Sequence, residues 1–123
     1  MAIRIVRLGS ARAANEGPRL GTVRRPPRGV RKADYARRNY YDVWLPDLAP
    51  SARLVARAQE DWAGFTKAYR REMKAAAAER LIAVLAALSQ DADFSVGCYC
   101  EDEERCHRSI LRELLAEHGA RLA

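Results

Sequence analysis

The sequence predicts a small α/β domain in which a mostly parallel sheet is covered by helices. The chain has 123 residues, of which 49% are hydrophobic, so we expect one domain over residues 1–123 with a core of its own. Short apolar segments with the two-residue period of strands stand at both ends of a longer region with helical period. A strand, a pair of helices, a second strand and a final helix favour parallel strands joined through helices.

The first half of the chain predicts strands and turns. Ile3, Ile5 and Leu8 have the alternation of a first strand. Residues 9–21 are predicted to form a loop around Gly17 and Pro18. A short second strand is predicted at residues 20–23, so the two ranges share residues 20 and 21. Pro26 and Pro27 end that strand, because proline has no N–H to donate to a neighbour. A short helix is expected over residues 31–39, followed by an aromatic stretch that ends at Pro46.

The second half predicts three helical segments and one buried strand. Ser51 is a good N-cap, because its hydroxyl accepts a hydrogen bond from the first helical turn. The apolar residues that follow recur every three or four positions, with a break expected near residues 59–61: Leu54, Ala58, Trp62, Phe65, Tyr69 and Met73. Later elements are a helix at 79–89, a buried strand at 94–100 and a C-terminal helix. Gly119 is expected to cap that last helix.

Charge is distributed unevenly along the chain, whose formal net charge is +6. Residues 1–40 hold 11 Lys and Arg against 2 acids, a balance of +9, and the remainder holds 11 against 14, a balance of −3. A basic segment attracts phosphates and nucleic acid, whereas the alternative is an arginine-rich surface without a ligand. Tyr40, Tyr41 and Trp44 could stack nucleobases beside Arg37 and Arg38, or form part of the core.

Nothing in the sequence predicts a membrane partner. No apolar run approaches the roughly 20 residues that a membrane span needs. The first residues resemble a strand and not a secretory signal, so we expect a cytoplasmic protein. Three cysteines, an odd number, are expected to be free, reactive or metal-bound in a reducing compartment.

The best candidate site is the segment 97–109, which contains all three cysteines and one of the two histidines. It lies where the last predicted strand leads into the last predicted helix. In open α/β sheets, ligands bind beyond the carboxyl ends of strands, next to helix N-termini. Position and composition therefore both point to this segment.

Metal binding is the first interpretation, since Cys98, Cys100, Cys106 and His107 form a nominal Cys₃His set. Geometry argues against it if residues 94–100 are extended. Cα atoms two residues apart are then about 6.8 Å apart, whereas two thiolates on one tetrahedral zinc are about 3.8 Å apart. Adjacent residues 106 and 107 would also point about 100° apart on a helix. We therefore predict no metal and expect much less than one zinc per chain.

Three other interpretations remain for the same segment. A cysteine in the first helical turn has a stabilised thiolate and could be a reactive or redox thiol. His107 and Arg108 could instead hold an anion or nucleotide, because arginine offers a bidentate fork and histidine moves a proton near neutral pH. The plain alternative is that the cysteines pack as small apolar residues. His118 is interpreted as a helix C-terminal residue without a site role.

Several motifs together resemble one known family. They are Asp42-Val43-Trp44-Leu45-Pro46-Asp47-Leu48-Ala49-Pro50-Ser51 followed by Trp62, Phe65, Tyr69 and Glu72, then Arg24 with Pro27-Arg28-Gly29-Val30 and Lys32, and finally Cys100-Glu101 with Cys106-His107-Arg108-Ser109. This order resembles the YeaO-like branch of the domain of unknown function 488 family, in which Pro26 here replaces a motif tryptophan. The resemblance implies a compact α/β fold in a bacterial cytosol. It implies no activity or cofactor, and it makes Arg24, Arg28 and residues 106–108 a plausible cluster.

The sequence therefore predicts a pocket between the Pro27-Arg28-Gly29 turn and the start of the last helix. The candidate catalytic residues are His107 and Cys106, and the candidate ligand-binding residues are Arg24, Arg28, Arg108 and Cys100. The expected ligand is a phosphate-bearing or otherwise anionic small molecule. Two alternatives stay open: a nucleic-acid-binding module that uses residues 1–40, and a thiol or metal site at Cys98, Cys100 and Cys106. We expect His107 and Arg108 to point into a crevice, so that removing either would cost at most about 1 kcal/mol.

Overall fold

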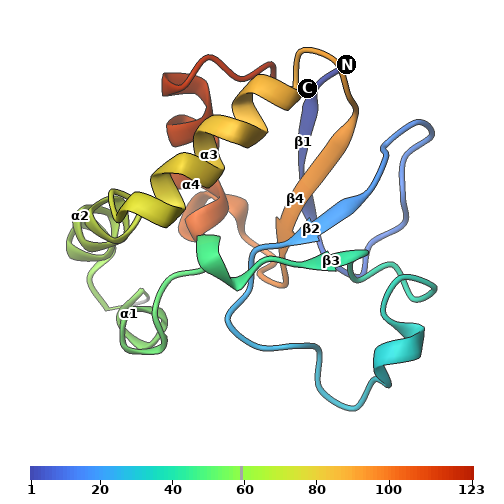
Figure 1. The fold of residues 1–123 in the computed structure, drawn as a ribbon. Helices are drawn as coiled ribbons and strands as arrows, with labels where there is room; N and C mark the ends of the chain where they lie inside the picture. Colours follow the sequence, from blue (N-terminus) through green and yellow to red (C-terminus); the bar gives the residue numbers. More distant parts are fainter. Residues whose placement is uncertain (59) are drawn as a thin grey trace.

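Four parallel strands form one sheet in the spatial order β1-β4-β2-β3 (Figure 1). The strands are β1 (Ile3–Arg7), β2 (Arg19–Gly21), β3 (Val43–Trp44) and β4 (Phe94–Cys98). The computed structural model describes residues 1–58 and 60–123. Strand β4 is buried throughout, because it pairs with β1 on one side and β2 on the other. The predicted fold class, a single α/β domain with a parallel sheet, is confirmed.

Helices cover one side of this sheet (Figure 1). They are α1 (Ala52–Arg57), α2 (Trp62–Glu72), α3 (Ala76–Leu88) and α4 (His107–Glu117), with short 3-10 turns η1 (Lys32–Asp34), η2 (Pro46–Leu48) and η3 (Glu103–Arg105). Their apolar residues pack with Ile3, Phe94 and Val96 of the sheet in the main core. The two chain ends lie close together, because Ile3 also bridges Leu122 (Figure 1).

The predicted helix caps and the predicted break are found. The Ser51 hydroxyl accepts a hydrogen bond from Leu54 N–H at 3.4 Å, and α1 starts at the next residue. The chain leaves α1 after Arg57 and enters α2 at Trp62, with Asp61 as its cap. Residue 59, part of the expected break, lies outside the described residues. Gly119 follows α4 with a φ of 85°, a conformation that favours glycine.

Three predicted boundaries differ from the structure. The helix expected over residues 31–39 is only the turn η1, which buries no side chain and so gains little from packing. Helix α3 begins three residues earlier than residue 79, because alanine is the best helix former and Ala78 is buried. The last strand stops at Cys98 and does not reach residue 100. That early stop decides the geometry of the cysteines.

A buried ion pair holds the loop between β1 and β2 on the other side of the sheet. The Arg19 side chain is 1% exposed, and its Nε donates to Glu16 Oε2 at 2.6 Å. Its remaining N–H groups donate to the carbonyls of Ser10, Ala11 and Asn39. Glu16 also accepts from the Ser95 hydroxyl in β4 at 2.8 Å. Arg19 therefore ties two loops and the central strand together and adds no charge to the surface.

Stability is expected to fall in acid because of Glu16. Burial opposes its ionisation, but hydrogen bonds from Arg19, Ala13 and Ser95 outweigh burial and lower its pKa from 4.5 to about 2. A lowered carboxyl pKa stabilises the fold above the unfolded value of 4.5 and loses that contribution as pH falls toward 2. The full contribution is about 3 kcal/mol, and more than half is lost by about pH 3. Urea unfolding of the protein and of Glu16→Gln between pH 7 and pH 3 tests this; equal pH slopes would contradict it.

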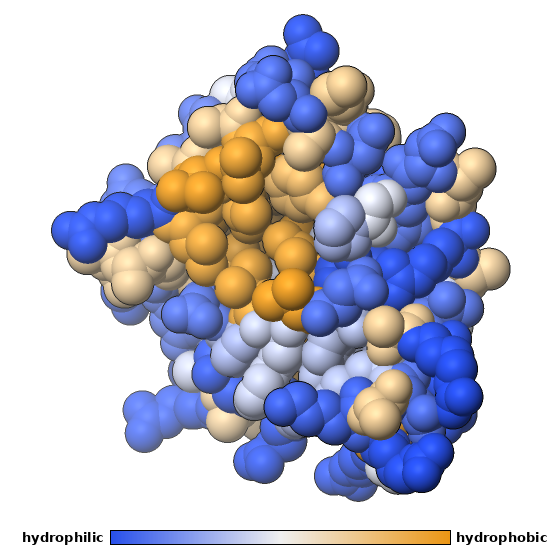
Figure 2. Space-filling model, turned by 45° about the vertical axis from the view of Figure 1, so that its right-hand side comes forward, coloured by the Kyte–Doolittle hydropathy of each residue, from blue (hydrophilic) through white to orange (hydrophobic). Residues whose placement is uncertain are grey.

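The surface combines charged residues with one apolar area (Figure 2). Large apolar side chains that are about half exposed include Val43, Val55, Val84 and Leu88. Across the part of the chain that the structure describes, no helix has the length and apolar character needed to cross a membrane.

Candidate functional site

An open cleft of about 950 Å³ lies at the carboxyl ends of β1, β2 and β4. Its walls come from residues 7–10, 23–28 and 98–100, which directly follow or end these three strands. Tyr40, the start of α1 and the His107 ring complete the lining. This is the sheet edge at which the sequence predicted a site, because parallel strands bring their carboxyl ends together.

Arginine dominates the charge of this cleft. Arg7, Arg24, Arg25 and Arg28 line it, whereas no Asp or Glu among the described residues does. Arg24 is already engaged: its Nε donates to Pro50 O at 3.1 Å and its Nη2 to Ala49 O at 3.0 Å. For Arg25 and Arg28, no side-chain hydrogen bond is found within the described chain. These two guanidinium groups are therefore the ones that a ligand would meet.

The three cysteines converge at the inner end of the cleft. Their Sγ atoms all lie within 4.8 Å of one another, and those of Cys98 and Cys106 are 2.8 Å apart. The expected separation of Cys98 and Cys100 along an extended strand is wrong, because β4 ends at Cys98 and the chain then bends. That bend also lets Cys100 N–H donate to Cys98 Sγ at 3.3 Å.

The three thiols differ in exposure. Cys100 is exposed, whereas Cys98 and Cys106 are each only 2% exposed. Cys98 and Cys100 line the cleft, and Cys106 does not. Hydrogen bonding with Cys106 and Cys98 lowers the pKa of the Cys100 thiol, and the positive charge of Arg108 adds to this effect. The pKa values of Cys98 and Cys106 are raised, first of all by hydrogen bonding with Cys100. Cys100 is therefore the most acidic of the three thiols.

His107 is held by a hydrogen-bond chain that determines its tautomer. Its Nε2 lies 3.1 Å from Thr22 Oγ1, and the Thr22 hydroxyl donates its only proton to Gly97 O at 3.0 Å. The proton between His107 and Thr22 must then come from Nε2. Burial lowers the pKa of His107 to about 4, so the ring is neutral at pH 7. Its unprotonated Nδ1 lies 3.7 Å from Cys106 Sγ.

Arg108 does not point into the cleft, contrary to the sequence-based prediction. It is 3% exposed, and its Nη2 donates to Cys100 O at 2.7 Å. Its Nε has no partner within the described structure. The reason is helical geometry: Arg108 is one residue beyond His107 on α4, so the two side chains leave the helix in different directions. Arg108 therefore stabilises the bend at Cys100 from the side of that bend that faces away from the cleft.

The structure thus separates the predicted site residues into two groups. Arg24, Arg28, Cys100 and His107 line the cleft, whereas Cys106 and Arg108 support it from behind. Sequence reasoning missed Thr22, Arg25 and Tyr99. A polar Thr22 at the end of an apolar strand was an available signal for the first of these. Tyr99 gave no signal, because it alternates with the cysteines as any strand residue would.

Comparison with known proteins identifies a family that matches the chain. The family model described as DUF488-N3a, the active DUF488-N3 subclade, matches residues 3–119 of the chain. No curated protein and no solved structure matches the chain.

Proposed function

This chain belongs to the DUF488 family, and we propose that it binds a phosphate-bearing or otherwise anionic small molecule in the cleft at the carboxyl ends of β1, β2 and β4. The observation that carries this proposal is that Arg25 and Arg28 both line the cleft, without an acidic lining residue in the described chain. Two arginines without protein acceptors attract an anion and offer it planar, bidentate donors.

The size and walls of the cleft favour an organic anion with a flat apolar part. A volume of about 950 Å³ is near the upper end for small-molecule sites. Tyr40 and Tyr99 stand edge to face in the lining, with ring centroids 6.2 Å apart. Pro26, Pro27 and Val55 add apolar surface. Aromatic and apolar walls around a few cationic groups suit a nucleotide or a similar phosphate ester better than a free inorganic ion.

The family description names an active subclade. His107 lines the cleft with a neutral ring that Thr22 orients, but its Nδ1 faces Cys106 and its pKa of about 4 makes it a weak base at pH 7, so its catalytic role stays a prediction. The catalytic role of Cys106 stays a prediction: its thiol lies beside His107 Nδ1, but behind the lining of the cleft.

Nucleic-acid binding through residues 1–40 has less support. Much of the basic excess there is neutralised or structural. Arg12, Arg31 and Arg37 pair with Asp42 or Asp34, Arg19 is buried, and Arg24 donates to backbone carbonyls. Trp44 is partly exposed, but its Nε1 donates to Val23 O at 2.8 Å. These contacts leave no flat row of arginines beside free aromatic rings.

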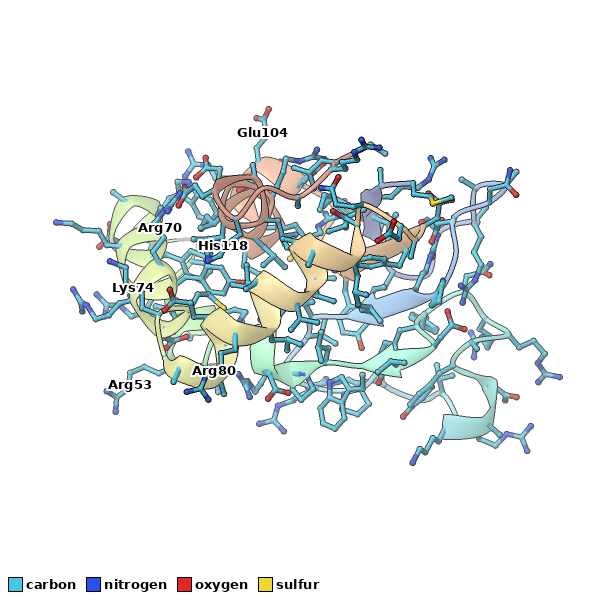
Figure 3. The ribbon with its side chains drawn as sticks, turned by 45° about the horizontal axis from the view of Figure 1, so that its top comes forward. Arg53, Arg70, Lys74, Arg80, Glu104 and His118 are labelled. Atoms are coloured by element: carbon cyan, nitrogen blue, oxygen red, sulfur yellow. The ribbon has the colours of Figure 1, made fainter. Side chains whose placement is uncertain are left out.

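Calorimetric titration with adenosine 5′-monophosphate tests the proposal. We expect saturable binding by the protein, and a loss of about tenfold or more in Arg25→Gln or Arg28→Gln, since a charged hydrogen bond contributes roughly 1.5–3 kcal/mol. Adenosine, which lacks the phosphate, should bind more weakly than the nucleotide. Arg80→Gln is the matched control, because Arg80 projects from α3 into solvent (Figure 3).

Two outcomes would contradict the proposal. One is equal affinity for adenosine and its monophosphate. The other is binding only to duplex DNA, with an affinity that falls about a thousandfold between 50 and 200 mM salt. The latter would establish the nucleic-acid alternative.

A further inference from the structure

We propose that Cys98, Cys100 and Cys106 bind one thiophilic metal ion of the zinc class, with His107 as the fourth ligand. This site lies at the inner end of the cleft and goes beyond the proposed anion binding, which uses Arg25 and Arg28. All three cysteines of the chain are in it, and all three are free thiols. The sequence-based argument against metal assumed an extended strand through residue 100, which the structure does not have.

The distances fit a tetrahedral ion. Thiolates on one zinc are about 3.8 Å apart, and a thiolate and a ring nitrogen are about 3.6 Å apart. The three Sγ atoms lie within 4.8 Å of one another. His107 Nδ1 lies 3.7 Å from Cys106 Sγ but outside the group of ligand atoms that are mutually within 4.8 Å, so the His107 ring would shift toward the other two sulfurs when a metal binds. The Cys98–Cys106 separation of 2.8 Å is too short, so these two sulfurs would move apart by about 1 Å.

His107 is prepared as a ligand by its hydrogen bonds. A metal-bound histidine donates its other ring N–H to an acceptor that fixes the ring and the tautomer. Here Nε2–H donates to Thr22 Oγ1, which leaves Nδ1 unprotonated on the side of the thiols. The Thr22 hydroxyl is fixed in turn by Gly97 O in β4. His107 and Thr22 thus have the arrangement of a ligand and its outer-shell partner.

Backbone N–H groups and a buried guanidinium surround the thiols and stabilise their thiolate forms. Cys100 N–H donates to Cys98 Sγ, and Cys106 is the N-cap of the 11-residue helix α4. The Arg108 guanidinium is buried behind Cys100, and its Nε has no hydrogen-bond partner in the described structure. Three thiolates and one divalent ion carry a net charge of −1, which this buried cation balances. Binding therefore releases thiol protons and places no uncompensated charge in the interior.

Cobalt(II) is the probe, because a tetrahedral cobalt thiolate site absorbs strongly in the visible and near ultraviolet. Fully reduced protein, with three thiols confirmed by titration in denaturant, is mixed with Co²⁺ and then with Zn²⁺. We expect one Co²⁺ per chain, a thiolate-to-cobalt charge-transfer band, and complete displacement by Zn²⁺. Cys100→Ser should lower the affinity by more than about 100-fold, since even outer-shell changes cost 10- to 100-fold.

Two further variants keep the test specific. Cys100 is exposed, so its serine variant should retain the far-ultraviolet circular dichroism of the protein. Thr22→Val should weaken Co²⁺ binding about 10- to 100-fold through His107. His118→Gln is the control, because that exposed histidine lies at the end of α4, where its ring forms a hydrogen bond with the Leu114 carbonyl. Arg28→Gln should bind Co²⁺ normally, which separates this test from that of anion binding.

The proposal is overturned if reduced protein with three titratable thiols shows no charge-transfer band. It is equally overturned if folded Cys100→Ser binds Co²⁺ as tightly as the unmodified protein. A single titratable thiol in protein that resists reduction would identify a Cys98–Cys106 disulfide instead of a metal site.

Discussion

Replacing Arg19 by methionine is expected to destabilise the protein by about 3–5 kcal/mol. The substitution removes a buried cation and leaves Glu16 charged, 3% exposed and without its partner. It also removes the donors to the Ser10, Ala11 and Asn39 carbonyls, so that the loop before β2 loses its attachment to the sheet. For a chain of this size, the melting temperature should fall by roughly 10–20 °C.

Thermal melts of Arg19→Met and Arg31→Met provide the comparison. Arg31 also pairs with an acid, Asp34, but its side chain is 81% exposed. An exposed pair contributes at most about 1 kcal/mol. Equal melting temperatures for the two variants would show that burial of the Glu16–Arg19 pair is not what holds this loop.

Arg108→Ala is expected to cost about 3 kcal/mol, because it leaves Cys100 O without its donor and opens a cavity in a buried position. This expected cost is larger than the cost of at most about 1 kcal/mol that the sequence predicted for a side chain that points into a crevice. The physical reason is that Arg108 supports the cleft and does not line it.

Arg105→Ala is the matched control for Arg108→Ala. Arg105 is exposed, with its guanidinium 5.9 Å from the Trp62 ring, a contact that contributes about 0.5–1 kcal/mol. Urea unfolding of both variants at pH 7 measures the difference. If Arg108→Ala lowers the free energy of unfolding no more than Arg105→Ala does, Arg108 does not support the cleft from behind and the sequence-based prediction for it stands.

The regular elements could be predicted because their patterns are local. The apolar spacing through Phe65 and Tyr69 determines α2, and the N-cap Ser51 and the αL residue Gly119 mark helix ends. The sheet order could not be predicted, since β4 inserts between β1 and β2 through contacts that are 91 and 76 residues apart in sequence. The sequence analysis counted Arg19 in the basic excess of residues 1–40, because only the fold shows that Glu16 pairs with it and that Ser95 in turn donates to Glu16.

Sequence reasoning identified the edge of the sheet at which the structure has a cleft, but not the internal geometry of that cleft. The carboxyl ends of the parallel strands and the start of α4 were located correctly from the cysteine-rich segment. The convergence of the thiols depends on a bend after Cys98, because the strand ends two residues before the predicted end at residue 100. Which of residues 106–108 faces the cleft depends on the rotation of α4 about its axis, which sequence spacing does not determine.

An NMR titration tests the central claim, that the cleft is the ligand site, most directly. Amide resonances of the protein are followed while adenosine 5′-monophosphate is added. Our account predicts that the largest shifts fall on residues 7–10, 23–28 and 98–100, which surround the cleft. Shifts concentrated on residues 31–38 or on the solvent face of α3, with residues 23–28 unmoved at saturation, would contradict it.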